Sequence, residues 1–534
     1  MRDTCAANSV SYDMQCSGEG QARMGSEQWA RAARGYALAS TRTVVLVAGG
    51  LGLVLAATSI VATGPWQGGQ RVAQRRLAQA LHAAQTARST PLPAPKPRLM
   101  ALPAPSWQPA QDVLRPAVGS TDAAAPLPVP GELAAALGPG LSASALGRAT
   151  ASVVDVATGR TLYASGAGSP QTPASTNKLA TATAALSLLG PDHRFSTRVV
   201  TAGPGRIVLV GGGDPTLTAA ATSGSDPQAS LATLATRTAA ALRAAGTGSV
   251  RLGYDISLFT GSPLHPIGVN DNIALVQALT VDEGRIDPNS TEDAPRYADP
   301  AATAAADFAA MLRARGITVQ GAPGPTTAPA KATAPTTAKA AAPAAAAPLA
   351  EVRSQPLSEI VERMLTNSDN DIAEALGHQV AIAAGQPATF AGGAAAVLGT
   401  LRGLGVRLDG TRLYDSSGLD NQDAIPADVL TQLLALDASP AHPELRSIVT
   451  GLPVAGFTGT LDPSVEGFDS SSGLGLVRAK TGTLSTVNTL AGLVVDRDGR
   501  LLAFAFMSSG TSDPDSARAG LDLLAGRVAA CGCR

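Results

Sequence analysis

Apolar and polar residues alternate in two groups of segments near the ends of the chain, a pattern typical of half-buried strands. The first group is ATASVVDV (149–156) and RTLYAS (160–165), joined by a turn around Thr158. The second is GLVRAKTGT (475–483), TVNTLAGLVVD (486–496) and RLLAFAFMS (500–508), followed by the helical sequence DSARAGLDLLAGRVAA. Strands at both ends with helices between them predict one antiparallel sheet flanked by helices, an α/β (α+β) fold.

Helical periodicity dominates the segments between these strands. One helix is predicted over Thr172–Leu189, with Pro173 in its first turn and Gly190 as a stop signal. Two more are predicted at LSEIVERML (357–365) and DIAEALGHQVAIAAG (371–385). Residues 196–320 instead combine the strands RIVLVGGG and SVRLGYD with two helical stretches, which predicts an inserted α/β domain.

Two other kinds of segment complete the predicted organisation. Residues 44–62 are uncharged and long enough to cross a bilayer, as a transmembrane anchor or as a cleaved signal peptide. Pro/Ala-rich and Ala/Pro/Thr-rich stretches are too poor in large apolar residues to pack. The predicted division is an amino-terminal cytoplasmic region at 1–43, an anchor or signal at 44–62, a linker at 63–128, a main domain at 129–195 plus 350–534, the inserted domain at 196–320 and a low-complexity loop at 321–348.

Composition excludes several function classes. The net charge is −1 and aromatic residues make up only 3% of the chain, so no nucleic-acid partner is expected. The four cysteines lie near the two ends, and the five histidines show no metal-ligand spacing. We therefore expect no metal and no cofactor.

Lysine is rare, and this changes how its positions are interpreted. Only five of the 40 Lys and Arg residues are lysines, and only Lys178 and Lys480 lie in segments that are expected to fold. Arginine stays protonated in proteins, whereas burial and neighbouring cations can bring a lysine pKa towards neutrality. The two lysines are therefore candidates for catalytic chemistry.

Lys178 follows Ser175 by three residues, so both side chains lie on one face at the start of the predicted helix. A neutral Lys178 there can take the proton of Ser175 as its hydroxyl attacks a carbonyl. Alone this pair is weak evidence, since an amino-terminal serine with a surface lysine gives the same spacing.

Two further motifs strengthen the interpretation. Ser368-Asp369-Asn370 lies in the break between two predicted helices, and Lys480-Thr481-Gly482-Thr483 lies on a predicted strand. Each has a structural explanation of its own, as a helix cap and as an ordinary hairpin strand. Together, in this order, they form the Ser-x-x-Lys, Ser-x-Asn and Lys-Thr-Gly set of penicillin-binding proteins and class A β-lactamases.

The sequence resembles the class C low-molecular-mass penicillin-binding proteins, which are D-alanyl-D-alanine carboxypeptidases and endopeptidases. The resemblance covers about residues 130–530 and is carried by six stretches. They are PASTNKLATATAALSLLGPDHRF, VGGGDPTL, PLSEIVERMLTNSDNDIAEAL, DSSGL (415–419), LPVAGFTGTL and AKTGTLSTVNTLAG. The resemblance implies a penicillin-binding transpeptidase/β-lactamase-like domain. It also implies that the partners are peptidoglycan stem peptides and β-lactam antibiotics. The protein would then lie in the cell envelope, either membrane-anchored through residues 44–62 or secreted.

The resemblance also implies roles for individual residues. Ser175 would be the nucleophile, Lys178 its general base and Ser368 a proton relay to the leaving amine. Asn370 would hold Lys178 and the substrate amide, and Lys480 the substrate carboxylate. The remaining candidates are Thr481, Gly482, Thr483 and Asp271 as substrate contacts, and the backbone N–H groups of Ser175 and Thr483 as the oxyanion hole.

Two other functions compete with this one. A class A-like β-lactamase shares the three motifs, but about 190 residues separate Ser175 from Ser368 and the deacylating Glu-x-x-Leu-Asn motif is absent. A catalytically idle wall-binding protein would keep the fold, yet every reactive position of the three motifs is intact.

Overall fold

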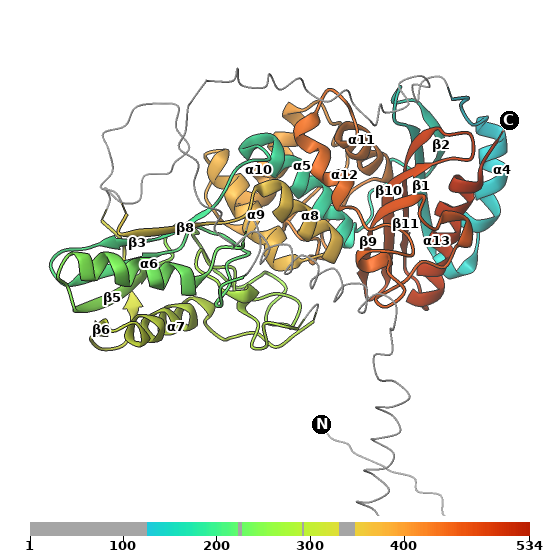
Figure 1. Ribbon diagram of the computed structural model, residues 1–534. Helices are drawn as coiled ribbons and strands as arrows, with labels where there is room; N and C mark the ends of the chain where they lie inside the picture. Colours follow the sequence, from blue (N-terminus) through green and yellow to red (C-terminus); the bar gives the residue numbers. More distant parts are fainter. Residues whose placement is uncertain (1–124, 223–226, 291–292, 330–347, 534) are drawn as a thin grey trace, which may run out of the picture. The chain divides into compact units, whose positions relative to one another are not determined.

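The structure is a computed structural model that describes residues 125–222, 227–290, 293–329 and 348–533 (Figure 1). The predicted segments 1–43 and 44–62, and nearly all of the linker at 63–128, lie outside these ranges. Within them, no helix is both long and apolar enough to cross a bilayer.

A five-stranded sheet combines strands from both ends of the predicted main domain, as the alternating pattern predicts. Its order is β2-β1-β11-β10-β9, and all its neighbours are antiparallel. The strands are β1 (Arg148–Asp155), β2 (Thr161–Ser165), β9 (Val477–Leu484), β10 (Val487–Val495) and β11 (Leu501–Ser509). Strand β9 is therefore an edge strand, which leaves one row of its backbone groups available to other partners.

Helices cover both faces of this sheet, and the side chains of β11 divide between them with the period of two of a strand. Leu502, Phe504 and Phe506 pack in one apolar core with α4 (Pro130–Leu141) and α13 (Pro514–Ala530). Ala503, Ala505 and Met507 pack in the core of the opposite face. That face carries α5 (Asn177–Leu189), α8 (Leu357–Asn367), α9 (Asn370–Ala383), α10 (Phe390–Gly403), α11 (Ala427–Asp437) and α12 (Arg446–Gly451).

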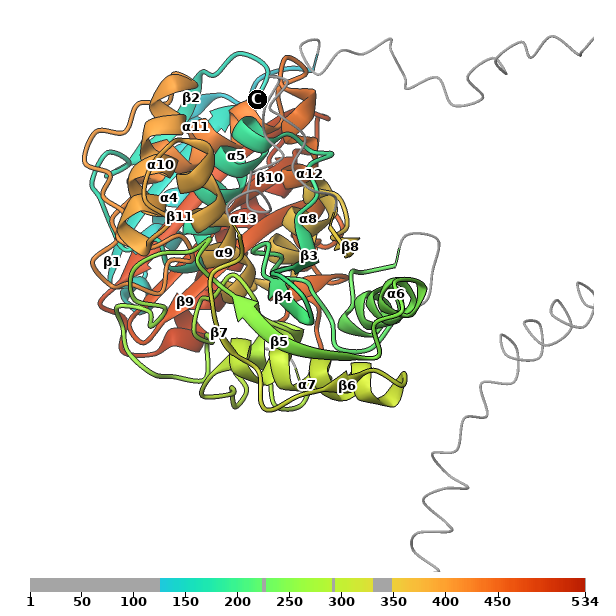
Figure 2. The ribbon, with the colours of Figure 1, turned by 90° about the vertical axis from the view of Figure 1, so that its left-hand side faces the viewer.

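A second sheet occupies the segment between α5 and α8, with order β6-β5-β4-β3-β8 and β7 beside β5. The strands are β3 (Ser196–Thr201), β4 (Arg206–Val210), β5 (Ser249–Asp255), β6 (Thr318–Val319), β7 (Gly324–Pro325) and β8 (Ala350–Arg353). Helices α6 (Leu231–Ala244) and α7 (Pro300–Ala314) share its core (Figure 2). This sheet extends to Arg353, whereas the sequence pattern ends the inserted domain at residue 320.

Strands β3 and β8 are where the chain enters and leaves this second sheet. They pair antiparallel, with Ser196 opposite Arg353 and Val199 opposite Ala350. The two ends of the insertion are therefore hydrogen-bonded to each other. They lie next in sequence to α5, which contains Lys178, and to α8, which ends just before Ser368.

Candidate active site

Ser175 lies in a single 3₁₀ turn, η3 (Ala174–Thr176), that leads directly into α5. The residue before it, Ala174, has a φ of 47°, in the left-handed region that non-glycine residues rarely adopt. Such backbone strain is typical of functional sites, where surrounding structure holds it in place. Lys178 follows in the first turn of α5, and its side chain is fully buried.

The amine of Lys178 is held by three oxygen acceptors. It donates to Ser175 Oγ at 2.9 Å, to Asn370 Oδ1 at 2.7 Å and to the carbonyl oxygen of Ser417 at 2.8 Å. Burial lowers the pKa of Lys178 to about 8, against the opposing charges of Asp415 and Glu374. A neutral amine that can accept the Ser175 proton is thus accessible near neutral pH.

The second motif lies at the junction of α8 and α9. Ser368 ends α8 in the left-handed conformation, with a φ of 58°. Asp369 caps α9 by accepting the amide of Ile372 at 2.9 Å, which gives this variable position of the motif a structural task. Asn370 binds Lys178 through Oδ1 and donates from Nδ2 to the carbonyl oxygen of Asn272 at 3.1 Å.

Lys480 of the third motif is hydrogen-bonded to Ser368 of the second. Its amine donates to Ser368 Oγ at 2.8 Å and to the carbonyl oxygen of Thr481 at 2.7 Å. The side chain is fully buried. Burial and the charge of Lys178 both hold the pKa of Lys480 well below its usual range. The five candidate catalytic side chains therefore form two hydrogen-bonded sets, one around each lysine.

The geometry of β9 places backbone donors beside Ser175. The backbone N–H of Ala479 points away from β10 and donates to the carbonyl oxygen of Pro453 at 2.9 Å. Because alternate residues of a strand direct their N–H groups to the same side, those of Thr481 and Thr483 also point to the free edge of β9. A Cβ on Gly482 would lie 2.9 Å from Ser175 N and 2.8 Å from Pro173 O. Glycine at this position is thus what allows β9 to pass so close to the Ser175 turn.

A cleft of about 650 Å³ opens over these groups. Its size is that of an ordinary small-molecule or peptide site. It is lined by members of the three motifs, Ser175, Ser368, Asn370, Thr481, Gly482 and Thr483. Residues of the insertion and of α8 also line it, among them Asp282, Glu283, Arg285, Asn289 and Arg363.

Comparison with known proteins agrees with this site. Residues 133–296 and 286–528 match the D-Ala-D-Ala carboxypeptidase 3 (S13) family. The chain belongs to the S13 family of D-Ala-D-Ala carboxypeptidases. It is thus a serine-type D-Ala-D-Ala carboxypeptidase, a hydrolase of the cell envelope.

Three relatives illustrate how far the similarity extends. This S13 enzyme is 37% identical to carboxypeptidase DacB of Mycolicibacterium smegmatis, over 78% of this chain and 88% of the relative. It is 30% identical to the D-alanyl-D-alanine carboxypeptidase of an Actinomadura species, over 68% of this chain and 78% of the relative. The crystal structure of penicillin binding protein 4 (dacB) from Haemophilus influenzae shares the fold, with a TM-score of 0.57, 21% identity, and coverage of 75% of this chain and 98% of that one.

The structure brings together all sequence-predicted site residues of the S13 enzyme except one. Asp271 is exposed and does not line the cleft, whereas its neighbour Asn272 does. The expectation that Asp271 contacts substrate therefore gains no support from its position. Asp415, the first residue of the DSSGL stretch, is fully buried and its charge acts on Lys178.

Several charged residues of the site carry no sequence motif and were missed. Burial raises the pKa of Glu283, and the carboxylate of Asp369 raises it further. Glu283 pairs with Arg285 at 3.0 Å and with Arg363. Because Arg363 lies on α8, 80 residues after Glu283, spacing could not reveal their contact. They give the cleft of the S13 enzyme a polar, charge-paired wall.

Two groups of described residues each bring three possible metal ligands together: His265, Glu374 and Asp415, and Glu283, Asp369 and Asp371. In the first, backbone amides already occupy Glu374 Oε1 and both oxygens of Asp415. In the second, Arg285, Arg296 and Arg363 pair with the carboxylates. In the second group Glu283 and Asp371 are thus already charge-paired, and among the carboxylate oxygens of the first group only Glu374 Oε2 has no hydrogen-bond partner.

Proposed function

We propose that Ser175 is the nucleophile of this carboxypeptidase and Lys178 its general base. The observation that carries the proposal is the 2.9 Å contact between Lys178 Nζ and Ser175 Oγ, at a buried amine whose pKa is lowered to about 8. Lys178 takes the hydroxyl proton as Ser175 Oγ bonds to the carbonyl carbon of the penultimate D-alanine. The charge that develops on the carbonyl oxygen is received by the N–H groups of Ser175 and Thr483, typically worth about 3 kcal/mol per donor.

Collapse of this intermediate breaks the peptide bond, and the departing amine takes a proton through Ser368. Ser368 suits this step because its hydroxyl already accepts from Lys480 at 2.8 Å. A water molecule then attacks the acyl-enzyme carbonyl, which releases the shortened stem peptide and returns the proton to Ser175. β-Lactams would acylate the same oxygen, but their ring-opened product would leave slowly.

Substrate binding is assigned to β9 and Lys480. The carboxylate of the terminal D-alanine would pair with Lys480 and with the hydroxyls of Thr481 and Thr483. Its approach would favour the charged form of Lys480, whose pKa is held down by burial and by Lys178. Asn370, which already binds Lys178, would also hold the substrate amide. Cleavage of the D-alanyl cross-link uses the same steps with a longer leaving group, which the 650 Å³ cleft can accept.

Residues 44–62 would anchor the enzyme in the membrane, and residues 63–128 would act as a spacer that lets the catalytic domain extend into the wall. Residues 44–62 are an uncharged run of bilayer length, and the sequence that follows them is rich in Pro and Ala.

Labelling with a fluorescent penicillin tests the role of Ser175. The wild-type protein should be labelled covalently and release the label slowly, and Ser175→Ala should not be labelled at all. Ser187→Ala, on the same helix but away from the cleft, is the matched control and should label like the wild type. A wild type that resists labelling contradicts the proposal, and rapid turnover of the penicillin would indicate a β-lactamase.

A further inference from the structure

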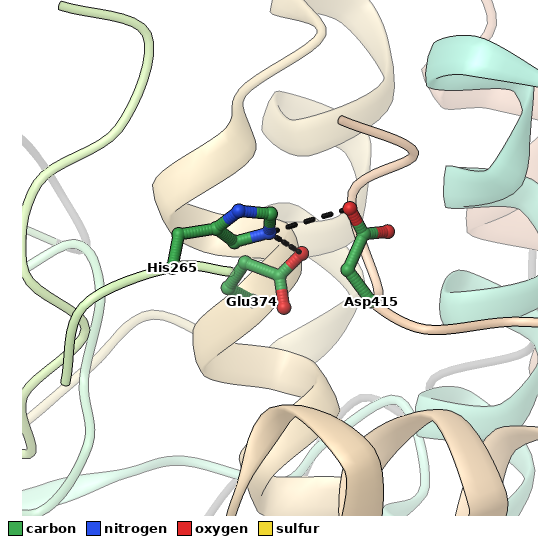
Figure 3. Close-up of side chains that lie close together, drawn as sticks. All are labelled: His265, Glu374 and Asp415. Atoms are coloured by element: carbon green, nitrogen blue, oxygen red, sulfur yellow. Dashed lines mark ion pairs between the residues drawn. The ribbon is translucent and has the colours of Figure 1, made fainter. Parts of the chain in front are cut away.

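His265 is a buried histidine that the steps above do not use. It belongs to the insertion between β5 and η4 (Asp282–Gly284) and is only 2% exposed. Figure 3 shows its ring pointing between two carboxylates from different parts of the enzyme region. Nε2 lies 3.3 Å from Asp415 Oδ2 and 3.6 Å from Glu374 Oε1, and both acids are fully buried.

These two carboxylates hold a turn that contacts the general base. Glu374 Oε1 accepts the amides of Ser416 and Ser417 at 2.9 and 2.7 Å. Asp415 Oδ1 accepts the amide of Gly418 at 2.7 Å. The carbonyl oxygen of Ser417 in turn accepts from Lys178 Nζ at 2.8 Å. Three contacts, through a carboxylate and Ser417, therefore connect His265 to the amine that activates Ser175.

The charges around His265 determine what it does there. The charged groups that face it are Glu374 on α9 and Asp415 in the turn region. Three further titratable groups interact with these two acids: His378 on α9, Asp423 and Lys178. Burial and Asp415 raise the pKa of Asp423, and burial lowers that of His378, so both favour the neutral form. Two buried negative charges then remain, on Glu374 and Asp415, with His265 between them.

We propose that His265 is a positioning residue for the reaction, a cation from the insertion that holds Glu374 and Asp415 and thereby the Ser417 turn and the amine of Lys178. The inference rests on the proposed role of Lys178 as general base. Burial and the amide of Ile267, which donates to Nδ1 at 3.3 Å, both favour the neutral ring, but the two carboxylates beside Nε2 raise the pKa of His265 to about 9. The imidazolium offsets the negative charges that would otherwise favour a protonated Lys178.

The test is the pH dependence of acylation in His265→Gln. The variant loses a positive charge and keeps two carboxylates beneath Lys178, so the pKa of Lys178 should rise by about one unit. We expect the rate constant for labelling by a fluorescent penicillin to fall about tenfold at pH 7 and to recover towards the wild-type value near pH 9.5. The reason is that the rising limb of the pH–rate profile, where Lys178 loses its proton, moves to higher pH.

His378→Gln is the matched control. His378 is also buried and its ring lies 5.0 Å from Phe390, as does the ring of His265, but it does not bridge the two carboxylates. Its loss should lower stability without moving the pH limb. The double variant His265→Gln, Glu374→Gln removes one charge of each sign and should return the limb towards that of the wild type.

Two results would overturn the inference. One is a His265→Gln protein that labels with the wild-type pH profile. The other, which needs no variant that folds, is an NMR titration of the histidine-labelled wild type in which the His265 ring is neutral at pH 7. If the wild type itself does not label, the assignment of Ser175 fails instead, so the two proposals are separable.

Discussion

The amine of Lys480 donates to the hydroxyl of Ser368 at 2.8 Å, although the two residues are 112 positions apart in the chain. This contact joins the second and third motifs as the Lys178 contact with Ser175 joins both ends of the first. The two lysines have similar burial but different neighbours, so they should respond differently to the same substitution.

Lys178→Arg should abolish acylation. The guanidinium keeps the positive charge but cannot lose its proton at any working pH, so Ser175 has no base. General-base catalysis typically contributes 10²–10⁴-fold, and we expect a loss of about this size in the labelling rate constant. Lys480→Arg retains the charge that a substrate carboxylate needs and should be the milder change, seen mainly in KM for D-alanine release from a pentapeptide. Equal losses in both variants would contradict these roles.

The rate of acylation should rise with pH. Burial lowers the pKa of Lys178 from 10.5 to about 8, so the fraction of neutral base increases as pH rises through about 8. Stopped-flow labelling between pH 6 and 10 should show this limb. In Asn370→Asp a carboxylate would replace the amide oxygen 2.7 Å from Lys178 Nζ and should move the limb to higher pH. A limb near 10.5 in the wild type would mean that burial of Lys178 does not perturb its titration.

Gly482→Ala should impair the enzyme severely. The new Cβ would lie 2.9 Å from Ser175 N and 2.8 Å from Pro173 O, both backbone atoms, so either β9 or the Ser175 turn must move. Displacement by a fraction of an ångström is enough to separate the two oxyanion donors, and we expect at least a tenfold lower labelling rate.

Gly399→Ala provides the comparison for this substitution. Gly399 lies in α10, where an added Cβ meets nothing within 4 Å. Alanine is the better helix former, so stability should rise by roughly 0.5–1 kcal/mol with unchanged labelling. If Gly482→Ala labels as well as this control, the close passage of β9 is not needed for activity.

Asp437→Asn should stabilise the protein at neutral pH. Asp437 is buried at the end of α11, with Oδ1 2.9 Å from Thr183 Oγ1, and burial raises its pKa well above 3.8. A raised pKa in the folded state means that this group favours folding at acidic pH and that the contribution is lost as pH rises. Urea unfolding should show a gain of about 1 kcal/mol or more at pH 7 and little gain near pH 4. An equal gain at both pH values would point to a cause other than ionisation.

The three motifs and the sheet could be predicted because their signals are local. Ser175 and Lys178 are one helical turn apart, and β9 to β11 show strand patterns that the structure confirms. Helix α10 was missed because FAGGAAAVLGTLRG is rich in glycine. It is stabilised by packing, since Gly393 contacts the backbone of Gly377 on α9 too closely for a larger residue.

The buried charges could not be predicted for a different reason. His265, Glu374 and Asp415 each look ordinary in the sequence, and only the fold brings them within 4 Å of a partner. The same holds for β8, whose four residues become a strand by pairing with β3 across the insertion. Spacing in the sequence identifies groups that act within one element, whereas groups that meet through tertiary contacts leave no comparable pattern.

The pairing of β1 with β11 also sets when the enzyme can first act. A chain is made from its amino terminus, and Lys480 follows Ser175 by about 300 residues. Strand β1 gains its central neighbour only when β11 has been made, and β9 joins through β10. The nucleophile is therefore present during most of synthesis without its partners. Reactivity toward the wall, or toward penicillin, therefore needs the last strands, and a chain that ends before β9 should not be labelled by penicillin.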